Sequence, residues 1–274
     1  MSPRSAATPR TVPVVLGVVV LLIGVGVATS WLLAGGRWLR MDTPSMGTAA
    51  PVGSLLWVRP VELEDVAVGD LVTVRPADAG GRTYTHRVVS TTPRGLRTGG
   101  VLSGEDPWVI DQARLVGRVD HVWPVLGLVL RLAPLLLALL LAAFLAPARL
   151  PERWRLPVRI VGVSLALSVV LVVHQPLTDA RMLAFDTGAE GARTTWVNAG
   201  QVPLRLRAPS TGASATMGPG ETATVAVART DARGRYVVSV RPDLPGWTWW
   251  LVGGPWVLLA LGHTLRERRT LHPA

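Results

Sequence analysis

The chain of 274 residues contains no cysteine. It therefore cannot form a disulfide, use a thiol nucleophile or build a cysteine-based metal site. Lysine is also absent, so all 28 basic residues are arginines. A serine nucleophile in this protein cannot be activated by lysine, and its general base must be a histidine or a carboxylate. No phosphate-binding glycine loop and no metalloprotease helix motif is present, and we expect no cofactor and no bound metal.

The net charge of +10 is compatible with binding to nucleic acid or to anionic lipid. The arginines gather at the ends of long apolar segments, which favours lipid and argues against nucleic acid. Hydrophobic residues make up 49% of the chain. This composition predicts a membrane protein with helical spans.

Four apolar segments predict four spans, at residues 14–35, 123–147, 158–174 and 247–264. The first is longer than the core of a cleaved signal peptide, and we interpret it as an anchor. Basic residues in the N-terminus (1–13), the loop 148–157 and the tail 265–274 predict that these segments are cytoplasmic. Residues 36–122 and 175–246 then lie outside the cell membrane, which predicts a multi-pass cell-membrane protein in contact with the bilayer.

Both outer segments have the pattern of all-β domains. Short strand-like runs occur at 55–58, 71–74, 83–89 and 115–119, and Gly80-Gly81 is a candidate hairpin tip. Residues 55–58 do not alternate, which fits either a buried strand or a surface in contact with lipid. Runs at 194–197, 202–206, 222–227 and 236–240 predict a second, small β-sandwich-like domain, with a surface or substrate partner as its expected ligand.

The most distinctive polar segment is Met41-Asp-Thr-Pro-Ser-Met-Gly47, which follows the first apolar run. Ser45 is its candidate nucleophile. Of the five histidines, His86 lies in a strand-like segment between Ser45 and an acidic stretch, 103–111, that we interpret as a loop. Serine, histidine and aspartate therefore follow one another within about seventy residues, which is the set of side chains that a serine hydrolase uses.

These segments resemble a type I signal peptidase. The resemblance rests on Thr43-Pro-Ser-Met46, Pro51-Val-Gly-Ser-Leu-Leu-Trp-Val-Arg-Pro60, Val68-Gly-Asp-Leu-Val-Thr-Val74, Thr85-His-Arg-Val88 and Leu115-Val-Gly-Arg-Val119. These boxes follow the family's order over residues 14–130. They are more similar to the archaeal and endoplasmic-reticulum branch, which uses histidine in place of lysine. The resemblance implies a β catalytic domain of the signal-peptidase type over 36–122.

The resemblance also implies roles for individual residues. Ser45 is the nucleophile, His86 the general base and Asp106 the acidic partner, with Asp111 as the alternative acid. The Ser45 amide and the Thr43 hydroxyl are the implied oxyanion donors. The family's Gly-Asp-x-Asn box is incomplete here, because residues 98–104 read Thr-Gly-Gly-Val-Leu-Ser-Gly. Pro44 also replaces the usual glycine.

The sequence thus predicts a membrane-bound serine endopeptidase that removes signal peptides from exported preproteins. One alternative is a non-catalytic membrane protein, in which the peptidase-like domain binds signal peptides or a partner. Another is a dedicated peptidase whose outer domain, 175–246, selects a few substrates.

Overall fold

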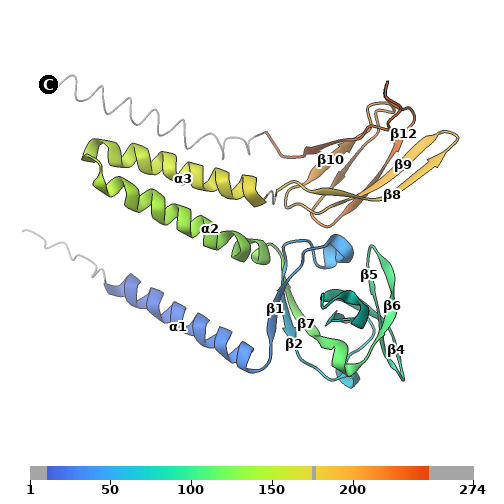
Figure 1. Ribbon diagram of the computed structural model, residues 1–274, viewed down its shortest axis with the longest axis horizontal. Coiled ribbons are helices and arrows are strands. Elements are labelled where there is room, and N and C mark those ends of the chain that lie inside the picture. Colours follow the sequence, from blue (N-terminus) through green and yellow to red (C-terminus); the bar gives the residue numbers. More distant parts are fainter. Residues whose placement is uncertain (1–10, 175–176, 247–274) are drawn as a thin grey trace, which may run out of the picture. The chain divides into compact units, whose positions relative to one another are not determined.

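The computed structural model describes residues 11–174 and 177–246 (Figure 1). The chain divides between Leu141 and Ala142 into two compact units, and each is described by itself. The predicted cytoplasmic residues 1–10, the predicted span 247–264 and the tail 265–274 lie outside the described residues.

Three long helices are described: α1 (Thr11–Leu33), α2 (Leu126–Leu145) and α3 (Glu152–His174). Within the described residues, two segments are long and apolar enough to cross a bilayer: α2 with the short 3-10 helix that follows it, at 126–149, and α3. α1 has 23 residues, which corresponds to about 34 Å. Its C-terminal part, Leu22–Leu33, is an apolar helical segment.

The prediction of a loop over 148–157 is wrong for most of its length. α2 continues as η5 (Ala146–Arg149), and α3 begins at Glu152. Pro157 lies inside α3, where it costs one helical hydrogen bond, and the helix nevertheless runs from Glu152 to His174. Gly162 of α3 approaches Ala143 so closely that an added Cβ would lie 2.8 Å from the Ala143 Cβ. A glycine is therefore needed where these two helices touch.

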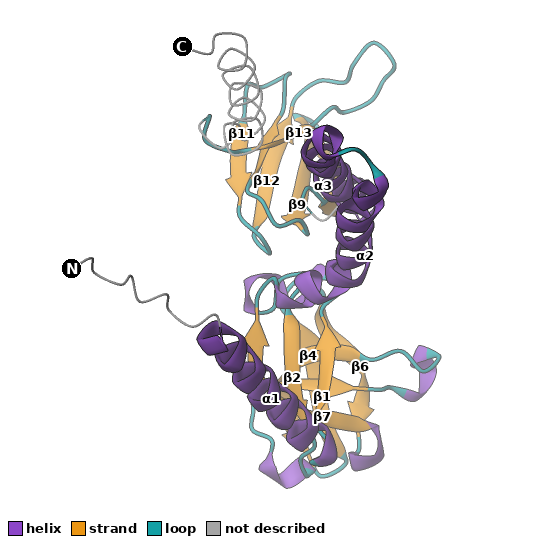
Figure 2. Cartoon of the chain, turned by 90° about the vertical axis from the view of Figure 1, so that its left-hand side faces the viewer, coloured by secondary structure: helices purple, strands orange, loops and turns teal. Residues whose placement is uncertain are grey.

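The first unit contains a seven-stranded antiparallel sheet with the order β1-β2-β7-β3-β4-β5-β6 (Figure 2). Its strands are β1 (Arg37–Arg40), β2 (Leu55–Arg59), β3 (Leu71–Val74), β4 (Tyr84–Thr92), β5 (Gly95–Gly100), β6 (Gly104–Ile110) and β7 (Leu115–Trp123). Short 3-10 helices lie between them: η1 (Pro44–Ala49), η2 (Leu63–Asp65), η3 (Ala77–Ala79) and η4 (Gln112–Arg114). Register shifts in four of the strand pairs mark bulges, which bend and twist the sheet.

The four predicted strands of this unit are confirmed as β2, β3, β4 and β7. Gly80 and Gly81, in the β3–β4 connection, both have positive φ angles, as a glycine turn requires. β1, β5 and β6 were not predicted, and the interpretation of 103–111 as a loop is wrong. Glycines make β5 and β6 poor strands by propensity, so their pairing depends on the sheet. β6 lies at the sheet's edge, where Pro107 is tolerated.

Two apolar clusters form the core of this unit. One contains Val72 and Val74 of β3, Val88, Leu96 and Ile110, and the other contains Met46, Leu56 and Val58 with neighbouring residues. In β2, Leu55, Leu56 and Val58 are buried, so the non-alternating run is a buried strand. The second cluster packs beneath the segment that carries Ser45, because Met46 is fully buried in it.

Tryptophans surround Trp57 of β2 where α1 meets the sheet. The Trp57 ring centroid lies 5.2 Å from Trp31 of α1, 6.5 Å from Trp38 of β1 and 6.0 Å from Trp123 of β7. The His121 and Trp123 rings are tilted by 51° to each other, with their centroids 4.4 Å apart. This tryptophan cluster joins the end of α1 to the first three strands of the sheet.

The second unit contains two three-stranded antiparallel sheets, β11-β10-β13 and β12-β9-β8. The strands are β8 (Ala180–Gly188), β9 (Gly191–Asn198), β10 (Leu204–Arg207), β11 (Ser214–Met217), β12 (Thr222–Val227) and β13 (Ser239–Pro242). Leu204 and Leu206 from one sheet and Val225 from the other share a core. Within the described residues, the prediction of β structure over 175–246 is confirmed, and β8 and β11 are additional strands.

Candidate active site

Ser45 lies in the first turn of η1, directly after β1. Thr43 is extended (φ −124°, ψ 150°), as expected for a residue that precedes proline. Gly47 breaks the helix with φ 53° and ψ −131°, a conformation that favours glycine. The backbone N–H of Leu102, in the β5–β6 turn, donates a 2.9 Å hydrogen bond to the Ser45 carbonyl. The nucleophile segment is therefore held from both the core and the β5–β6 turn.

His86 projects from β4 and is buried, with 5% of its surface exposed. Its Nε2 lies 3.2 Å from Ser45 Oγ, and its Nδ1 lies 2.7 Å from Asp106 Oδ2. The structure thus places the three residues in one hydrogen-bonded chain, in the order that a serine hydrolase requires. Neither the serine nor the aspartate is near His86 in sequence, since they are 41 and 20 residues away.

The acid that contacts His86 is Asp106 of β6, which is 8% exposed. Asp111 lies beyond the end of β6 and caps η4, where its side chain accepts from the Arg114 N–H at 3.1 Å. Its carboxylate is half exposed and also pairs with the Arg114 guanidinium at 3.6 Å. The structure therefore does not bring Asp111 to His86.

Thr98 of β5 is a component of the site that the sequence analysis did not assign. Its fully buried hydroxyl donates a 2.6 Å hydrogen bond to Asp106 Oδ2, the oxygen that also contacts His86. Buried carboxylates need such donors, because an unpaired charge in the interior is costly. The only sequence signal was the position of Thr98, at the start of the segment where the family's Asp-Asn box is incomplete.

Gly100, at the end of β5, lies against Ser45 and His86. An added Cβ would lie 3.1 Å from the Ser45 carbonyl oxygen and 3.2 Å from His86 Nε2, and it would overlap with Ser103 Oγ. A side chain at this position would press on the His86 ring and on the Ser45 backbone. Glycine here keeps the space beside His86 open.

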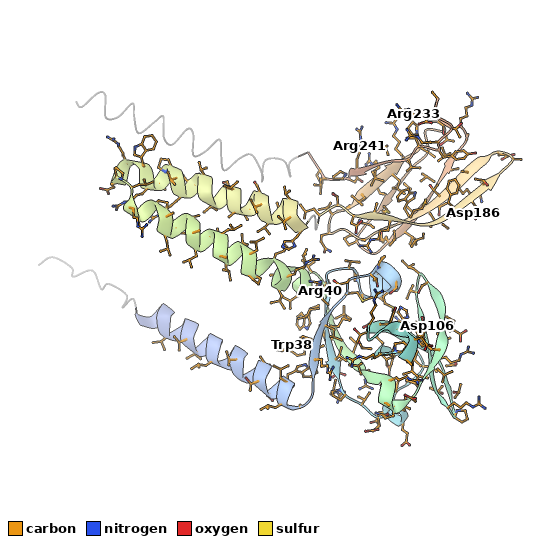
Figure 3. The ribbon with its side chains drawn as sticks, viewed as in Figure 1. Trp38, Arg40, Asp106, Asp186, Arg233 and Arg241 are labelled. Atoms are coloured by element: carbon orange, nitrogen blue, oxygen red, sulfur yellow. The ribbon has the colours of Figure 1, made fainter. Side chains whose placement is uncertain are left out.

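A cleft of about 220 Å³ leads to Ser45 and His86. One side is formed by the end of β1 and the segment after it, and the other side by the residues before and at the start of β4. It is lined by Leu39, Arg40, Met41, Asp42, Thr43, Ser45, Arg82, Thr83, Tyr84, Thr85 and His86. The Thr43 hydroxyl lies 3.3 Å from Ser45 Oγ, so the second implied oxyanion donor is beside the nucleophile. Figure 3 labels Arg40 and Asp106, which come from β1 and β6.

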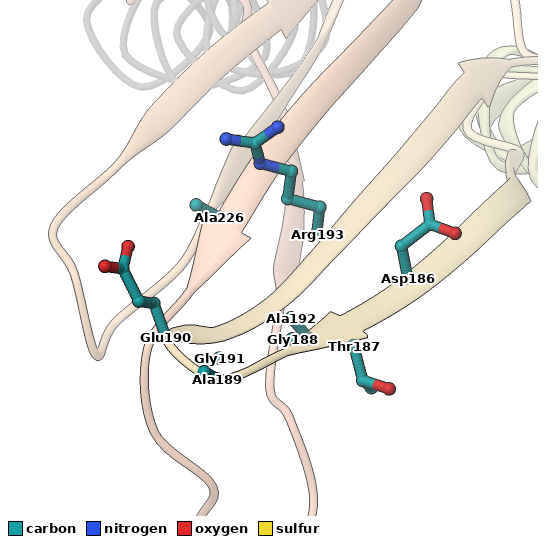
Figure 4. Close-up of a pocket in the computed structure, with 9 residues that line it drawn as sticks. All are labelled: Asp186, Thr187, Gly188, Ala189, Glu190, Gly191, Ala192, Arg193 and Ala226. Atoms are coloured by element: carbon teal, nitrogen blue, oxygen red, sulfur yellow. The ribbon is translucent and has the colours of Figure 1, made fainter.

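A cavity of about 400 Å³ lies in the second unit, at the β8–β9 hairpin (Figure 4). Its charged side chains are Asp186, Glu190 and Arg193, and Thr187 supplies the single hydroxyl of the lining. Its lining contains no histidine. It does not contain the serine–histidine–aspartate hydrogen-bonded chain of the cleft beside Ser45, and we place the candidate active site in the first unit.

Comparison with protein-family models and with curated proteins finds no match to this chain.

Proposed function

We propose that the protein is a membrane-bound serine endopeptidase that removes N-terminal signal peptides from exported preproteins. The observation that carries the proposal is the hydrogen-bonded chain from Ser45 through His86 to Asp106, with distances of 3.2 and 2.7 Å. A buried aspartate on Nδ1 holds the imidazole so that Nε2 faces the hydroxyl, which is the arrangement that activates a serine.

In the first half of the reaction, Ser45 Oγ attacks the scissile carbonyl carbon while His86 Nε2 takes the hydroxyl proton. The carbonyl π electrons move to the oxygen and form a tetrahedral oxyanion. As the C–N bond breaks, His86 returns the proton to the leaving amine, and the signal peptide remains as an ester on Ser45. Asp106 stabilises the imidazolium that exists between these two proton transfers.

In the second half, water attacks the ester carbonyl while His86 takes one of its protons. The new tetrahedral species collapses, the C–Oγ bond breaks, and the proton passes to Ser45 Oγ to restore the free enzyme. The Ser45 amide lies in the first turn of η1, where N–H groups have no acceptor within the helix, and we assign it to the oxyanion. The Thr43 hydroxyl is the proposed second donor.

In this proposal, the membrane positions the substrate's cleavage site. We infer four spans, with 36–122 and 175–246 on the extracytoplasmic face. The two described helices of sufficient length and apolar character support the inner pair of spans, and the 23-residue α1 supports the anchor. A signal peptide that crosses the same bilayer would expose its cleavage site near the outer surface, within reach of an anchored catalytic domain. We further propose that the second β domain binds a surface partner or selects substrates.

The test is processing of a model preprotein by the full chain in detergent or lipid nanodiscs. Wild type is expected to cleave, whereas Ser45→Ala and His86→Ala lose cleavage and keep the wild-type circular dichroism. Ser90→Ala and His121→Ala are matched controls, since neither residue belongs to the site, and both are expected to cleave. Failure of the wild type on several preproteins, or cleavage by Ser45→Ala, would reject the catalytic proposal in favour of a non-catalytic signal-peptide binder.

A further inference from the structure

The cleft beside Ser45 is lined by two arginines, of which one is paired with a carboxylate and the other, among the described residues, is not. Arg40 is neutralised by Asp42, whose Oδ1 accepts from the Arg40 Nε at 2.6 Å. Arg82 lines the same cleft and is exposed. Within residues 11–174 and 177–246, its side chain has neither a carboxylate partner nor a hydrogen bond. The cleft therefore presents one uncompensated positive charge.

The backbone fixes the point from which the Arg82 side chain extends. Gly80 and Gly81 have positive φ angles, and the Arg82 N–H donates a 3.1 Å hydrogen bond to the Ala79 carbonyl. Two residues further on, Tyr84 begins β4. The Tyr84 and His86 rings are 6.0 Å apart, because residues two apart in a strand lie on one face. Arg82 lies between the Gly80-Gly81 turn and β4, and it lines the cleft together with Tyr84 and His86.

The spacing sets the part of a peptide that Arg82 can contact. Arg82 and His86 are four positions apart in the chain, so their backbones lie at most about 14 Å apart. A peptide that lies extended in the cleft, with its scissile bond at Ser45, would bring a side chain about four residues from that bond opposite Arg82. A carboxylate is the group that an arginine fork binds best.

We propose that Arg82 forms a carboxylate subsite in this cleft, which binds an aspartate or glutamate of an extended peptide about four residues from the bond that Ser45 attacks. The position of the subsite relative to the scissile bond rests on the proposed function, whereas carboxylate binding by Arg82 does not. The substrates are then peptides with an aspartate or glutamate at one fixed distance from the scissile bond.

The test measures binding, so that it does not depend on cleavage. Fluorescent peptides with one aspartate, moved through positions three to five residues on either side of an Ala-x-Ala junction, are titrated onto the full-length Ser45→Ala protein in nanodiscs. Matching peptides carry asparagine. One aspartate position is expected to bind up to about fivefold more tightly than its asparagine match, the range of an exposed ion pair, and salt should weaken this preference.

Substitutions at Arg82 identify the source of the preference. Arg82→Gln is expected to remove it, and Arg82→Glu to reverse it in favour of a peptide with arginine at the same position. Arg94→Gln, which changes an exposed arginine in the β4–β5 turn, is expected to leave it intact. Equal binding of aspartate and asparagine peptides at every position, no measurable binding of any acidic peptide, or a preference that persists in Arg82→Gln would each overturn the inference.

Cleavage by the otherwise wild-type protein separates this inference from the proposed function. Cleavage of both peptide series with equal efficiency and with no binding preference removes the subsite and keeps the peptidase. An aspartate preference that depends on Arg82, without cleavage of any peptide, keeps the subsite and removes the peptidase.

Discussion

Thr98 donates its hydroxyl hydrogen to Asp106 Oδ2 at 2.6 Å, and both side chains are buried. The same oxygen lies 2.7 Å from His86 Nδ1, so the threonine holds the carboxylate that orients the base. Thr98 touches no substrate in this arrangement and is a positioning residue.

Thr98→Val is therefore expected to lower kcat by about tenfold with little change in KM, because the carboxylate loses a charge-assisted hydrogen bond of about 1.5–3 kcal/mol. Thr98→Ser should restore most of the rate. The His86 Nδ1–H proton resonance, which reports its bond to Asp106, should shift in the valine variant only. Thr73→Val, which breaks the buried 2.8 Å hydrogen bond between Thr73 and Thr85, is the matched control for a purely structural loss.

The two candidate acids give opposite predictions. Asp106→Asn keeps the shape of the side chain and removes its charge, and we expect kcat to fall by about 10²–10⁴-fold, as for the aspartate of other serine hydrolase triads. Asp111→Ala should keep the rate and lower the free energy of unfolding by about 1 kcal/mol, through loss of the η4 cap. Rate assays and urea denaturation of both variants distinguish the roles, and a large rate loss in Asp111→Ala would contradict the assignment.

Gly100→Ala should reduce kcat by about 100-fold, because the new methyl group would displace His86 Nε2 or the Ser45 backbone, and small displacements of reacting groups are costly. The rate is measured together with the melting temperature. Ser103→Ala added to Gly100→Ala removes the overlap with Ser103 Oγ but leaves the contacts with the catalytic pair. If the double variant regains full activity, the clash with Ser103 alone explains the loss and the prediction is wrong.

The tryptophan cluster predicts a stability effect. Trp57→Leu removes ring contacts with Trp31, Trp38 and Trp123. We expect the first unit to lose about 2 kcal/mol of unfolding free energy, because each aromatic pair contributes about 0.5–1.5 kcal/mol beyond buried area. Trp154→Leu, at an exposed position of α3, is the control and should have little effect. An equal loss in both variants would mean that the cluster adds no stability beyond ordinary hydrophobic contact.

The sequence predicted much of this arrangement from local signals. Val72, Val74 and Val88 lie in strand patterns that can be read from the local sequence alone. Ser45 and His86 lie in segments that resemble known motifs. Asp106 and Asp111 are five positions apart, and the sequence does not show where β6 ends. It therefore could not decide which of the two carboxylates reaches His86. Thr98 escaped notice because a threonine followed by two glycines has no pattern of its own, and its role exists only through the pairing of β5 with β6. The start of α3 was misplaced because Pro157 and the arginines around it are typical of a loop.

The strand order determines how much of the chain must be synthesised before the sheet can form. β7 lies between β2 and β3, although it is the last strand of the sheet to be made. Until residues 115–123 have been added, the sheet has no strand that joins the β1–β2 pair, which flanks Ser45, to the β3–β4 pair, which carries His86. The sheet that positions Ser45 beside His86 is therefore incomplete until β7 has been made. Under the proposed function, a growing chain is expected to have no hydrolase activity until the seven-stranded sheet is complete.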